Sequence, residues 1–192
     1  VIVGGIPGDR RAVVSTASYE ARKYGVHSAL PLAKAVELCP NAIFLRGNHK
    51  RYAEVSHKIM SIFKEFSPSV IQMSIDEAFI DATGTERLFG PPQVLAAKIK
   101  ERVMQATGLT VSIGIASTMY VAKIASGFRK PNGLTLIPFG DEEKFMTSLP
   151  LEKVWGAGTK TIAHIKNAGI RTTAQLRDKS LASLTTIFGN CT

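Results

Sequence analysis

The sequence predicts an α+β fold, and three observations lead to it. Apolar residues follow helical spacing over residues 49–66, which is typical of an amphipathic helix. They alternate strictly with other residues over 109–115, which is typical of a half-buried strand. Across residues 49–117 such patterns follow one another in the order helix, strand, strand, helix, strand. That order is most of a ferredoxin-like split βαβ unit.

Short elements are expected in residues 1–47. We predict strands at 1–3, 12–16 and 42–45 and helices at 19–24 and 31–38. None of these strands fits the first strand of the split βαβ unit, so we expect residues 1–47 to form a self-contained insert. The missing strand would then precede residue 1. Its absence would leave inner strand edges unpaired, at about 1–3 kcal/mol for each buried backbone group without a partner.

The remaining elements follow in turn. A hairpin of two strands is expected over residues 70–83, and the later elements are a helix at 92–107, a strand at 109–117, a helix at 118–128 and a strand at 134–137. Leu149-Pro150 marks a boundary, after which two short helices flank Gly156-Ala157-Gly158. The sequence therefore predicts a small helical region from residue 149 onward.

Composition narrows the class of function. Lys and Arg outnumber Asp and Glu by 24 to 15 and give a net charge of +9, which favours nucleic acid as a partner over an anionic membrane surface. No stretch is long and apolar enough to span a membrane, and no signal peptide opens the chain. The sequence contains only two cysteines, Cys39 and Cys191. This small number argues against a disulfide scaffold or a zinc site and is typical of a protein in a reducing cytoplasm.

Asp76 and Glu77 are the most informative pair of residues. They lie between two apolar runs that are predicted as strands, so both carboxylates are placed on a tight turn. Adjacent carboxylates repel each other unless a cation lies between them, and a Mg²⁺ ion that handles phosphate usually takes only one or two protein carboxylates. The alternative is a solvated acidic turn, which the pair alone would favour. The rest of the sequence favours the metal site.

Two further segments could hold an anion. Tyr19 and Arg22 are three residues apart on a predicted helix and share a face, so a phenol hydroxyl and a guanidinium could hold phosphate oxygens side by side. A solvated basic helix is an equal alternative. Lys130-Pro131-Asn132-Gly133 is a rigid turn that would hold one ammonium in place, although by itself it is an ordinary turn.

Gly156-Ala157-Gly158 is predicted as a hairpin that directs backbone N–H groups at the start of the second helix toward an anion. From residue 150 to residue 177 five basic residues accompany a single acidic one, Glu152. This charge excess favours a helix-hairpin-helix grip on DNA phosphates, which contacts the backbone rather than base edges. The alternative is an ordinary glycine helix stop. We interpret Trp155 as a packing residue rather than a base stacker.

Jointly, these segments resemble a Y-family (translesion) DNA polymerase, nearest to the bacterial DNA polymerase IV branch. The resemblance runs in order over nearly the whole chain, and its motifs are highly specific in combination. The matching segments are residues 15–26, 38–40, 74–79, 114–117, 122–126, 130–133 and 156–158.

The resemblance implies fingers over residues 1–47, a ferredoxin-like palm without its first strand over 48–148, and a thumb with the helix-hairpin-helix over 149–192. It implies error-prone, template-directed DNA synthesis past damaged bases. In the family, the residue at Asp76 bridges two Mg²⁺ ions and the residue at Glu77 binds the catalytic one. The implied partners are primer-template DNA and deoxynucleoside triphosphates.

The resemblance also assigns the other site residues. Ser15 lies where the family's fingers cover the nascent base pair, so it is assigned to the nucleotide-binding residues. The positions that contact the triphosphate are Thr16, Tyr19, Arg22 and Lys130. The positions implied to contact DNA are Gly156, Ala157, Gly158, Thr159 and Lys160.

The sequence departs from the family in several places. The first strand with a further metal-binding Asp and the little-finger domain are both lacking, so we expect an inactive part of a longer protein. A sliding clamp would be contacted, if at all, through a C-terminal region outside this sequence. Met119-Tyr120 replaces an expected polar and basic pair, and Trp155 replaces a common proline.

Two other classes of function stay open. One is a non-catalytic DNA-binding protein that uses the helix-hairpin-helix and a degenerate palm, although such a protein would not need Asp76, Glu77 and Lys130. The other is a nucleotide cyclase, which also uses paired carboxylates and metal but has no reason to carry a helix-hairpin-helix. Magnesium-dependent primer extension would separate all three.

Overall fold

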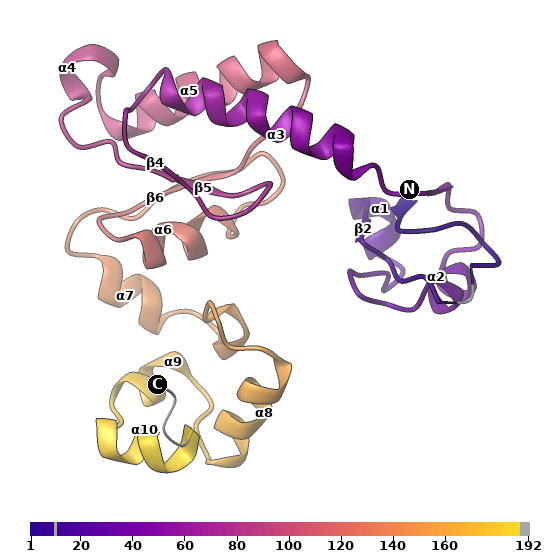
Figure 1. The fold of residues 1–192 in the computed structure, drawn as a ribbon. Coiled ribbons are helices and arrows are strands. Elements are labelled where there is room, and N and C mark those ends of the chain that lie inside the picture. Colours follow the sequence, from indigo (N-terminus) through magenta and orange to yellow (C-terminus); the bar gives the residue numbers. More distant parts are fainter. Residues whose placement is uncertain (10, 189–192) are drawn as a thin grey trace. The chain divides into compact units, whose positions relative to one another are not determined.

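The computed structural model describes residues 1–9 and 11–188, and the chain forms two compact units (Figure 1). The first unit is Val1–Val55 and the second begins at Ser56, so the division falls within α3 (His49–Lys64). Both units contain helices and strands, which confirms the α+β class. The domain borders expected after residues 47 and 148 stay predictions.

The first unit contains a sheet of three very short strands. β1 (Ile2–Val3) lies in the middle, antiparallel to β2 (Thr16–Ala17) and parallel to β3 (Phe44–Leu45). Two helices follow β2 in the chain, α1 (Tyr19–Arg22) and α2 (Leu32–Leu38). The buried core is made of apolar side chains from residues 2–35: Ile2, Val14, Ala17, Ala21, Val26, Leu32 and Ala35.

The strand predicted at 12–16 is wrong over most of its length. Val14 exchanges backbone hydrogen bonds with a different segment, donating to Leu30 O at 2.9 Å and accepting from Ala29 N at 2.8 Å. Only Thr16–Ala17 pairs with β1. Because the neighbouring loop already uses these backbone groups, they are not available to the sheet.

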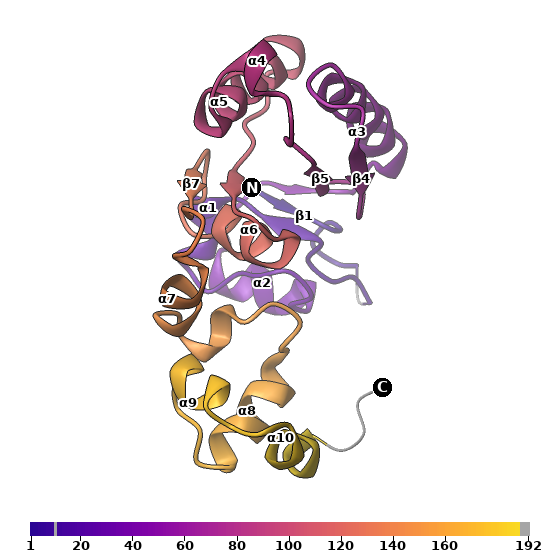
Figure 2. The same cartoon turned by 90° about the vertical axis from the view of Figure 1, so that its left-hand side faces the viewer.

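In the second unit, two long helices cover one side of the strands. α3 packs against α5 (Pro92–Thr107), and the core between them includes Ile80 and Ile113 from the strands. α6 (Met119–Ser126) lies on the other side of the strands (Figures 1 and 2). The buried side chains between α3 and α5 are Ile62, Phe66, Leu95, Ile99 and Val103.

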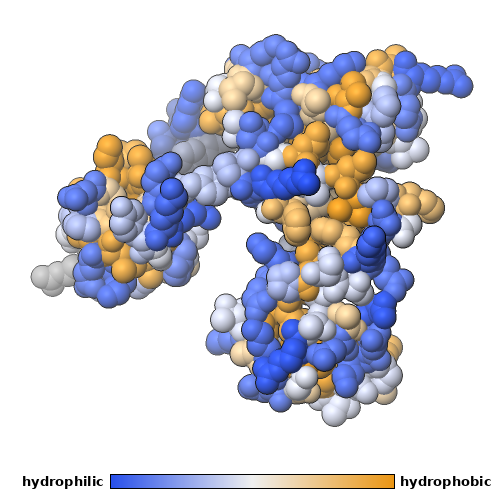
Figure 3. Space-filling model, turned by 180° about the vertical axis from the view of Figure 1, so that it is seen from behind, coloured by the Kyte–Doolittle hydropathy of each residue, from blue (hydrophilic) through white to orange (hydrophobic). Residues whose placement is uncertain are grey.

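The strands of the second unit form two separate pairs. β4 (Val70–Gln72) runs antiparallel to β5 (Ala78–Ile80), which confirms the predicted hairpin. β6 (Ile113–Ile115) runs parallel to β7 (Leu134–Leu136). Within the described residues these pairs are separate two-stranded sheets, so β5 is not hydrogen-bonded to β6. Figure 3 shows hydrophobic side chains exposed in the middle of this unit, between hydrophilic stretches.

β6 lies unusually close to α6. A Cβ atom at Gly114 would lie 2.1 Å from the carbonyl oxygen of Ala122 and 2.4 Å from the backbone nitrogen of Ser126. Only glycine fits there, because backbone atoms of the helix occupy the space that a side chain would need. α6 begins at a Thr118 N-cap, whose hydroxyl accepts the Val121 N–H at 3.3 Å.

Over residues 149–188 the chain is mainly helical, as predicted. It contains the short 3₁₀ helix η1 (Leu151–Lys153) and the α-helices α8 (Thr159–Asn167), α9 (Thr173–Arg177) and α10 (Leu181–Phe188). Its core is formed by Leu151, Ile162, Ile165 and Ile170.

The sequence reading missed some short helices, including α4 (Glu86–Phe89) and α7 (Glu142–Thr147). Both have fewer than two turns, so they carry almost no periodic signal. Cys39 is a free, half-buried thiol, and Cys191 lies outside the described residues. Among the helices that the structure describes, none has the length and apolar character needed to cross a bilayer.

Candidate functional site

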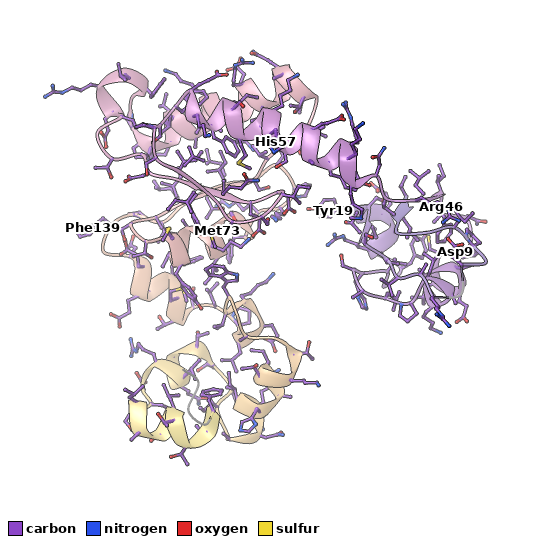
Figure 4. The ribbon with its side chains drawn as sticks, in the orientation of Figure 1. Asp9, Tyr19, Arg46, His57, Met73 and Phe139 are labelled. Atoms are coloured by element: carbon purple, nitrogen blue, oxygen red, sulfur yellow. The ribbon has the colours of Figure 1, made fainter. Side chains whose placement is uncertain are left out.

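Asp76 and Glu77 lie in the turn between β4 and β5, as the sequence predicts (Figure 4, where Met73 marks the start of the turn). The backbone amides of Met73 and Ser74 both donate to the carbonyl oxygen of Glu77, at 2.9 and 3.2 Å. The Ser74 hydroxyl donates to Asp76 Oδ1 at 2.7 Å. These bonds close the acidic turn, residues 73–77, and hold both carboxylates at one end of the hairpin.

A cation from a distant element meets this turn. Lys123 on α6 forms an ion pair with Glu77, and their side chains are 22% and 42% exposed. The sequence predicted that something positive must accompany the two carboxylates, but it gave Lys123 no role. Helical spacing places this lysine away from the buried Val121 and Ala125, and that signal alone does not identify its partner.

The turn fits a Mg²⁺ site in which the protein supplies few ligands. Among the described residues no group of three or more His, Cys, Asp or Glu side chains could hold a metal. Asp76 and Glu77 nevertheless offer hard oxygen ligands, and Glu77 already attracts a cation. Asp81 is engaged elsewhere, since its Oδ1 accepts the Thr83 N–H at 2.9 Å. The side chain of Thr83 and, to a smaller extent, this backbone bond lower the pKa of Asp81.

Lys130 lies exposed on a turn that a second lysine anchors. Lys100 on α5 donates to the carbonyl oxygens of Val111, Asn132 and Gly133 at 2.7, 2.8 and 3.3 Å. Partial burial lowers the pKa of Lys100, while the three carbonyl contacts favour its charged form. The strand predicted from residue 109 begins only at Ile113, and the Val111 carbonyl accepts from Lys100. No pattern in the sequence pointed to Lys100.

Thr16, Tyr19 and Arg22 lie together in the first unit. The guanidinium carbon of Arg22 is 5.6 Å from the centre of the Tyr19 ring, and its Nη2 donates to Thr16 Oγ1 at 3.5 Å. Arg22 Nε also donates to the Ala17 carbonyl at 2.9 Å, and this bond fixes the orientation of the Arg22 guanidinium. Ser15 is exposed next to this group. The predicted shared face of Tyr19 and Arg22 is therefore present, with both side chains exposed.

The predicted glycine hairpin, residues 154–160, joins η1 to α8. Gly156 has φ +90°, a conformation that favours glycine, and Gly158 is the N-cap of α8. Within the described residues no side chain caps this end, so the first N–H groups of α8 have no side-chain acceptor, and the neighbouring Thr159 and Lys160 are exposed. Ala157 packs against the core of the helical region and anchors the hairpin.

Tyr120 and Trp155 link α6 to the glycine hairpin. The Tyr120 hydroxyl donates to the Trp155 carbonyl at 3.0 Å, and the ring centres are 5.6 Å apart with an interplanar angle of 45°. This contact fits the interpretation of Trp155 as a packing residue, and the alternative of a base stacker is not tested by it. Nothing in the sequence indicated that its partner would be Tyr120, because the two residues are far apart in the chain.

Comparison with known proteins decides the family. The family described as impB/mucB/samB matches residues 1–127, about two thirds of the sequence. The chain belongs to the impB/mucB/samB family. The resemblance to the Y-family polymerases is thereby confirmed, together with its polymerase IV branch.

Curated relatives of this impB/mucB/samB member are named DNA polymerase IV. The relative from Treponema denticola is 51% identical over 190 residues, which cover 99% of this chain and 48% of the relative. The relative from Dehalococcoides mccartyi is 47% identical over 176 residues, which cover 92% of this chain and 45% of the relative. The chain thus spans about half the length of the curated relatives it matches.

Solved structures of the family show the same fold. An insertion ternary complex of Dbh DNA polymerase matches with a TM-score of 0.87 and 31% identity, over 98% of this chain and 56% of that chain. DinB from Sulfolobus solfataricus matches with a TM-score of 0.89 and 30% identity, over 98% of this chain and 55% of that chain. The likeness therefore extends over nearly all of the present sequence.

Proposed function

We propose that this chain supplies the metal site, the nucleotide contacts and one DNA grip of a translesion DNA polymerase. The observation that carries the proposal is the closed turn that holds Asp76 and Glu77 beside the Lys123 ammonium, in a chain whose curated relatives are DNA polymerases IV. Because the chain spans about half of those relatives, we propose that synthesis requires the other half as well.

The proposed domains are fingers over residues 1–47, a ferredoxin-like palm over 48–148 and a helix-hairpin-helix thumb over 149–192. Two separate strand pairs covered by α3 and α5 on one side support the palm assignment. A cytoplasmic location and a sliding-clamp contact stay predictions.

At the acidic turn, Asp76 and Glu77 would hold Mg²⁺ through carboxylate oxygens, with substrate phosphates and water as further ligands. When bound, two such ions supply activation of the primer 3′ hydroxyl and stabilisation of the leaving pyrophosphate. The residues of this chain position the two carboxylates. Backbone amides of the turn hold the Glu77 carbonyl, and the Ser74 hydroxyl holds the Asp76 carboxylate. Lys123 balances the negative charge of the turn.

The nucleotide contacts are proposed to come from Ser15, Thr16, Tyr19 and Arg22 in the first unit and from Lys130 in the second. Arg22 is held over Tyr19 by bonds to Ala17 and Thr16, so its guanidinium is oriented before a phosphate arrives. Basic groups of this kind stabilise charge that develops on phosphate oxygens during transfer. The Lys100 anchor keeps the Lys130 turn in place.

The DNA grip is proposed to be the glycine hairpin, with contacts from Gly156, Ala157, Gly158, Thr159 and Lys160. The uncapped start of α8 supplies backbone N–H donors, and Lys160 adds charge beside them. Such contacts bind phosphates rather than bases, so they position DNA of any sequence. The net charge of +9 favours the same kind of partner.

Primer extension by the full-length protein that contains this chain tests the proposal. We expect Mg²⁺-dependent addition of deoxynucleotides on an undamaged template and across a damaged template base. DNA binding without any extension would favour the non-catalytic DNA-binding protein. Cyclic nucleotide production without extension would favour the cyclase.

A further inference from the structure

α6 contacts two of the proposed functional sites of the second unit. Lys123 pairs with Glu77 in the acidic turn, and Tyr120, three residues earlier, contacts Trp155 in the glycine hairpin. In Figures 1 and 2 α6 lies between the strands and the helices that follow residue 149. The helix is firmly held, because β6 packs on it at Gly114 without room for a side chain.

The Tyr120–Trp155 contact combines two different interactions. The hydroxyl bond fixes the main chain directly before Gly156, and the ring contact adds apolar packing between the same residues. Burial raises the pKa of the Tyr120 hydroxyl, so the donor stays protonated at neutral pH. Both side chains remain partly exposed, at 38% and 42%, so their contact lies at the surface rather than in a core.

The helical region is attached to the rest of the unit at a second place. The Thr173 hydroxyl contacts the carbonyl oxygens of Thr147 and Leu149 at 3.0 and 2.8 Å, and Arg177 pairs with Glu143. These contacts join α9 to α7, away from the hairpin. With the α7–α9 attachment alone, the helical region could rotate about that attachment. The second contact, at the hairpin, fixes the orientation of the helical region relative to α6.

Beside the Tyr120–Trp155 contact, α6 and the hairpin are not packed continuously. A groove of about 290 Å³ separates them, and its lining includes Ile124 and Phe128 on one side and Lys153 on the other. The Tyr120–Trp155 pair therefore bridges two surfaces that are open along the groove.

We propose that Tyr120 and Trp155 are positioning residues that hold the glycine hairpin at a set distance from the acidic turn, with α6 as the link between them. The inference rests on the proposed DNA grip of the hairpin. It assigns the pair the task of orienting the α8 N–H groups for a DNA phosphate before DNA binds. A hairpin that is already oriented loses less freedom on binding and binds more tightly.

Fluorescence gives a direct readout, because Trp155 is the only tryptophan of the chain. The variants are Tyr120→Phe, which removes only the hydroxyl, and Tyr120→Ala, which also removes the ring. Tyr52→Phe on α3 is the matched control. We expect Tyr120→Ala to shift Trp155 emission to longer wavelength and increase acrylamide quenching, with a smaller change for Tyr120→Phe and none for Tyr52→Phe.

Binding of a labelled primer–template duplex is then measured over a range of salt concentrations. We expect Tyr120→Ala to weaken binding about three- to tenfold without changing its salt dependence, because the phosphate contacts persist while the hairpin must be ordered. Tyr120→Phe should fall between Tyr120→Ala and wild type. Lys160→Ala should lower the salt slope by about one, as expected for a lost phosphate contact.

The two proposals fail in different ways. Wild-type duplex affinity in Tyr120→Ala, together with weakened binding in Lys160→Ala, would overturn the positioning role and leave the DNA grip in place. An unchanged salt slope and affinity in Lys160→Ala would overturn the DNA grip itself. Unchanged Trp155 fluorescence in Tyr120→Ala would show that the contact does not form in solution, which also overturns the positioning role.

Discussion

In the second unit, three carboxylates close together in sequence have different surroundings. Asp76 is exposed and accepts one hydrogen bond from Ser74, whereas Glu77 is half-buried and paired with Lys123. Asp81 accepts the backbone N–H of Thr83 and so stabilises its own loop. These surroundings support the proposed metal binding by the first two and a structural role for the third.

A magnesium titration tests this division. We expect weak Mg²⁺ binding by the chain, because the described residues provide no third ligand side chain. Asp76→Asn should abolish this binding in titration calorimetry, and Asp81→Asn should leave it unchanged. Tight binding that is lost on Asp81→Asn but kept on Asp76→Asn would mean that the site is misassigned.

In the proposed site Lys123 would compete with a metal for Glu77. We therefore expect Lys123→Met to tighten Mg²⁺ binding by up to about fivefold, since a partly exposed ion pair contributes up to about 1 kcal/mol. The same titration with Lys144→Met, an exposed lysine on α7, serves as the control. Equal or weaker binding in Lys123→Met would show that the lysine holds Glu77 in place for the metal.

At the scale of elements, local patterns in the sequence predicted much of the fold. The helix at 92–107 has the predicted bounds, and the acidic hairpin lies where two apolar runs meet. The same kind of pattern placed the carboxylates and the glycine hairpin, because each depends on neighbours in the chain. Short helices such as α7 were missed, since less than two turns gives no periodicity.

Contacts between distant residues could not be predicted in this way. Lys123 meets Glu77, and Lys100 meets Asn132, only because the strands and helices pack as they do. The partners of these two lysines are far away in the chain, so no residue spacing in a single sequence indicates them. The same holds for Gly114, which looks like any glycine until α6 lies against it.

Gly114 gives a prediction for the β6–α6 contact. Gly114→Ala should lower the free energy of unfolding by about 1–3 kcal/mol or more, because the added methyl group meets helix backbone at 2.1 and 2.4 Å. Gly127→Ala is the control, since its Cβ would lie 3.4 Å from the nearest atom, Ile124 O. Urea unfolding measures both. Equal stability of Gly114→Ala and wild type would show that β6 and α6 are farther apart.

The start of α7 gives a prediction for pH dependence. The Glu142 carboxylate accepts hydrogen bonds from the Ser117 hydroxyl and from the Gly140 N–H, the latter at 2.7 Å. The Ser117 bond is the largest cause that lowers the pKa of Glu142 in the folded chain. The resulting stability is present above the unfolded-state pKa and is lost as pH falls through the lower folded-state pKa.

Urea unfolding between about pH 6 and pH 3 measures this loss. Wild type should lose more stability on acidification than Glu142→Gln, whose amide does not titrate. Glu86→Gln, an exposed position at the start of α4, should keep the wild-type pH dependence. The same pH dependence in Glu142→Gln and wild type would contradict the assignment.

At the scale of the whole molecule, the proposed site residues are divided between the two compact units. Thr16, Tyr19 and Arg22 belong to the first, and the acidic turn and Lys130 belong to the second. Nucleotidyl transfer requires phosphate contacts and metal ligands to act on one substrate. Since the chain spans about half of its curated relatives, the proposed activity is to be tested on the full-length protein, whereas metal binding and unfolding can be measured on this chain.

The central claim is that the acidic turn is the metal site of nucleotidyl transfer. Its most direct test is the single-turnover rate of nucleotide incorporation by the full-length protein at saturating Mg²⁺. We predict a loss of at least about 100-fold in Glu77→Gln, with primer–template binding retained and Asp81→Asn near wild type. A Glu77→Gln rate within about threefold of wild type would place the metal site elsewhere and contradict the claim.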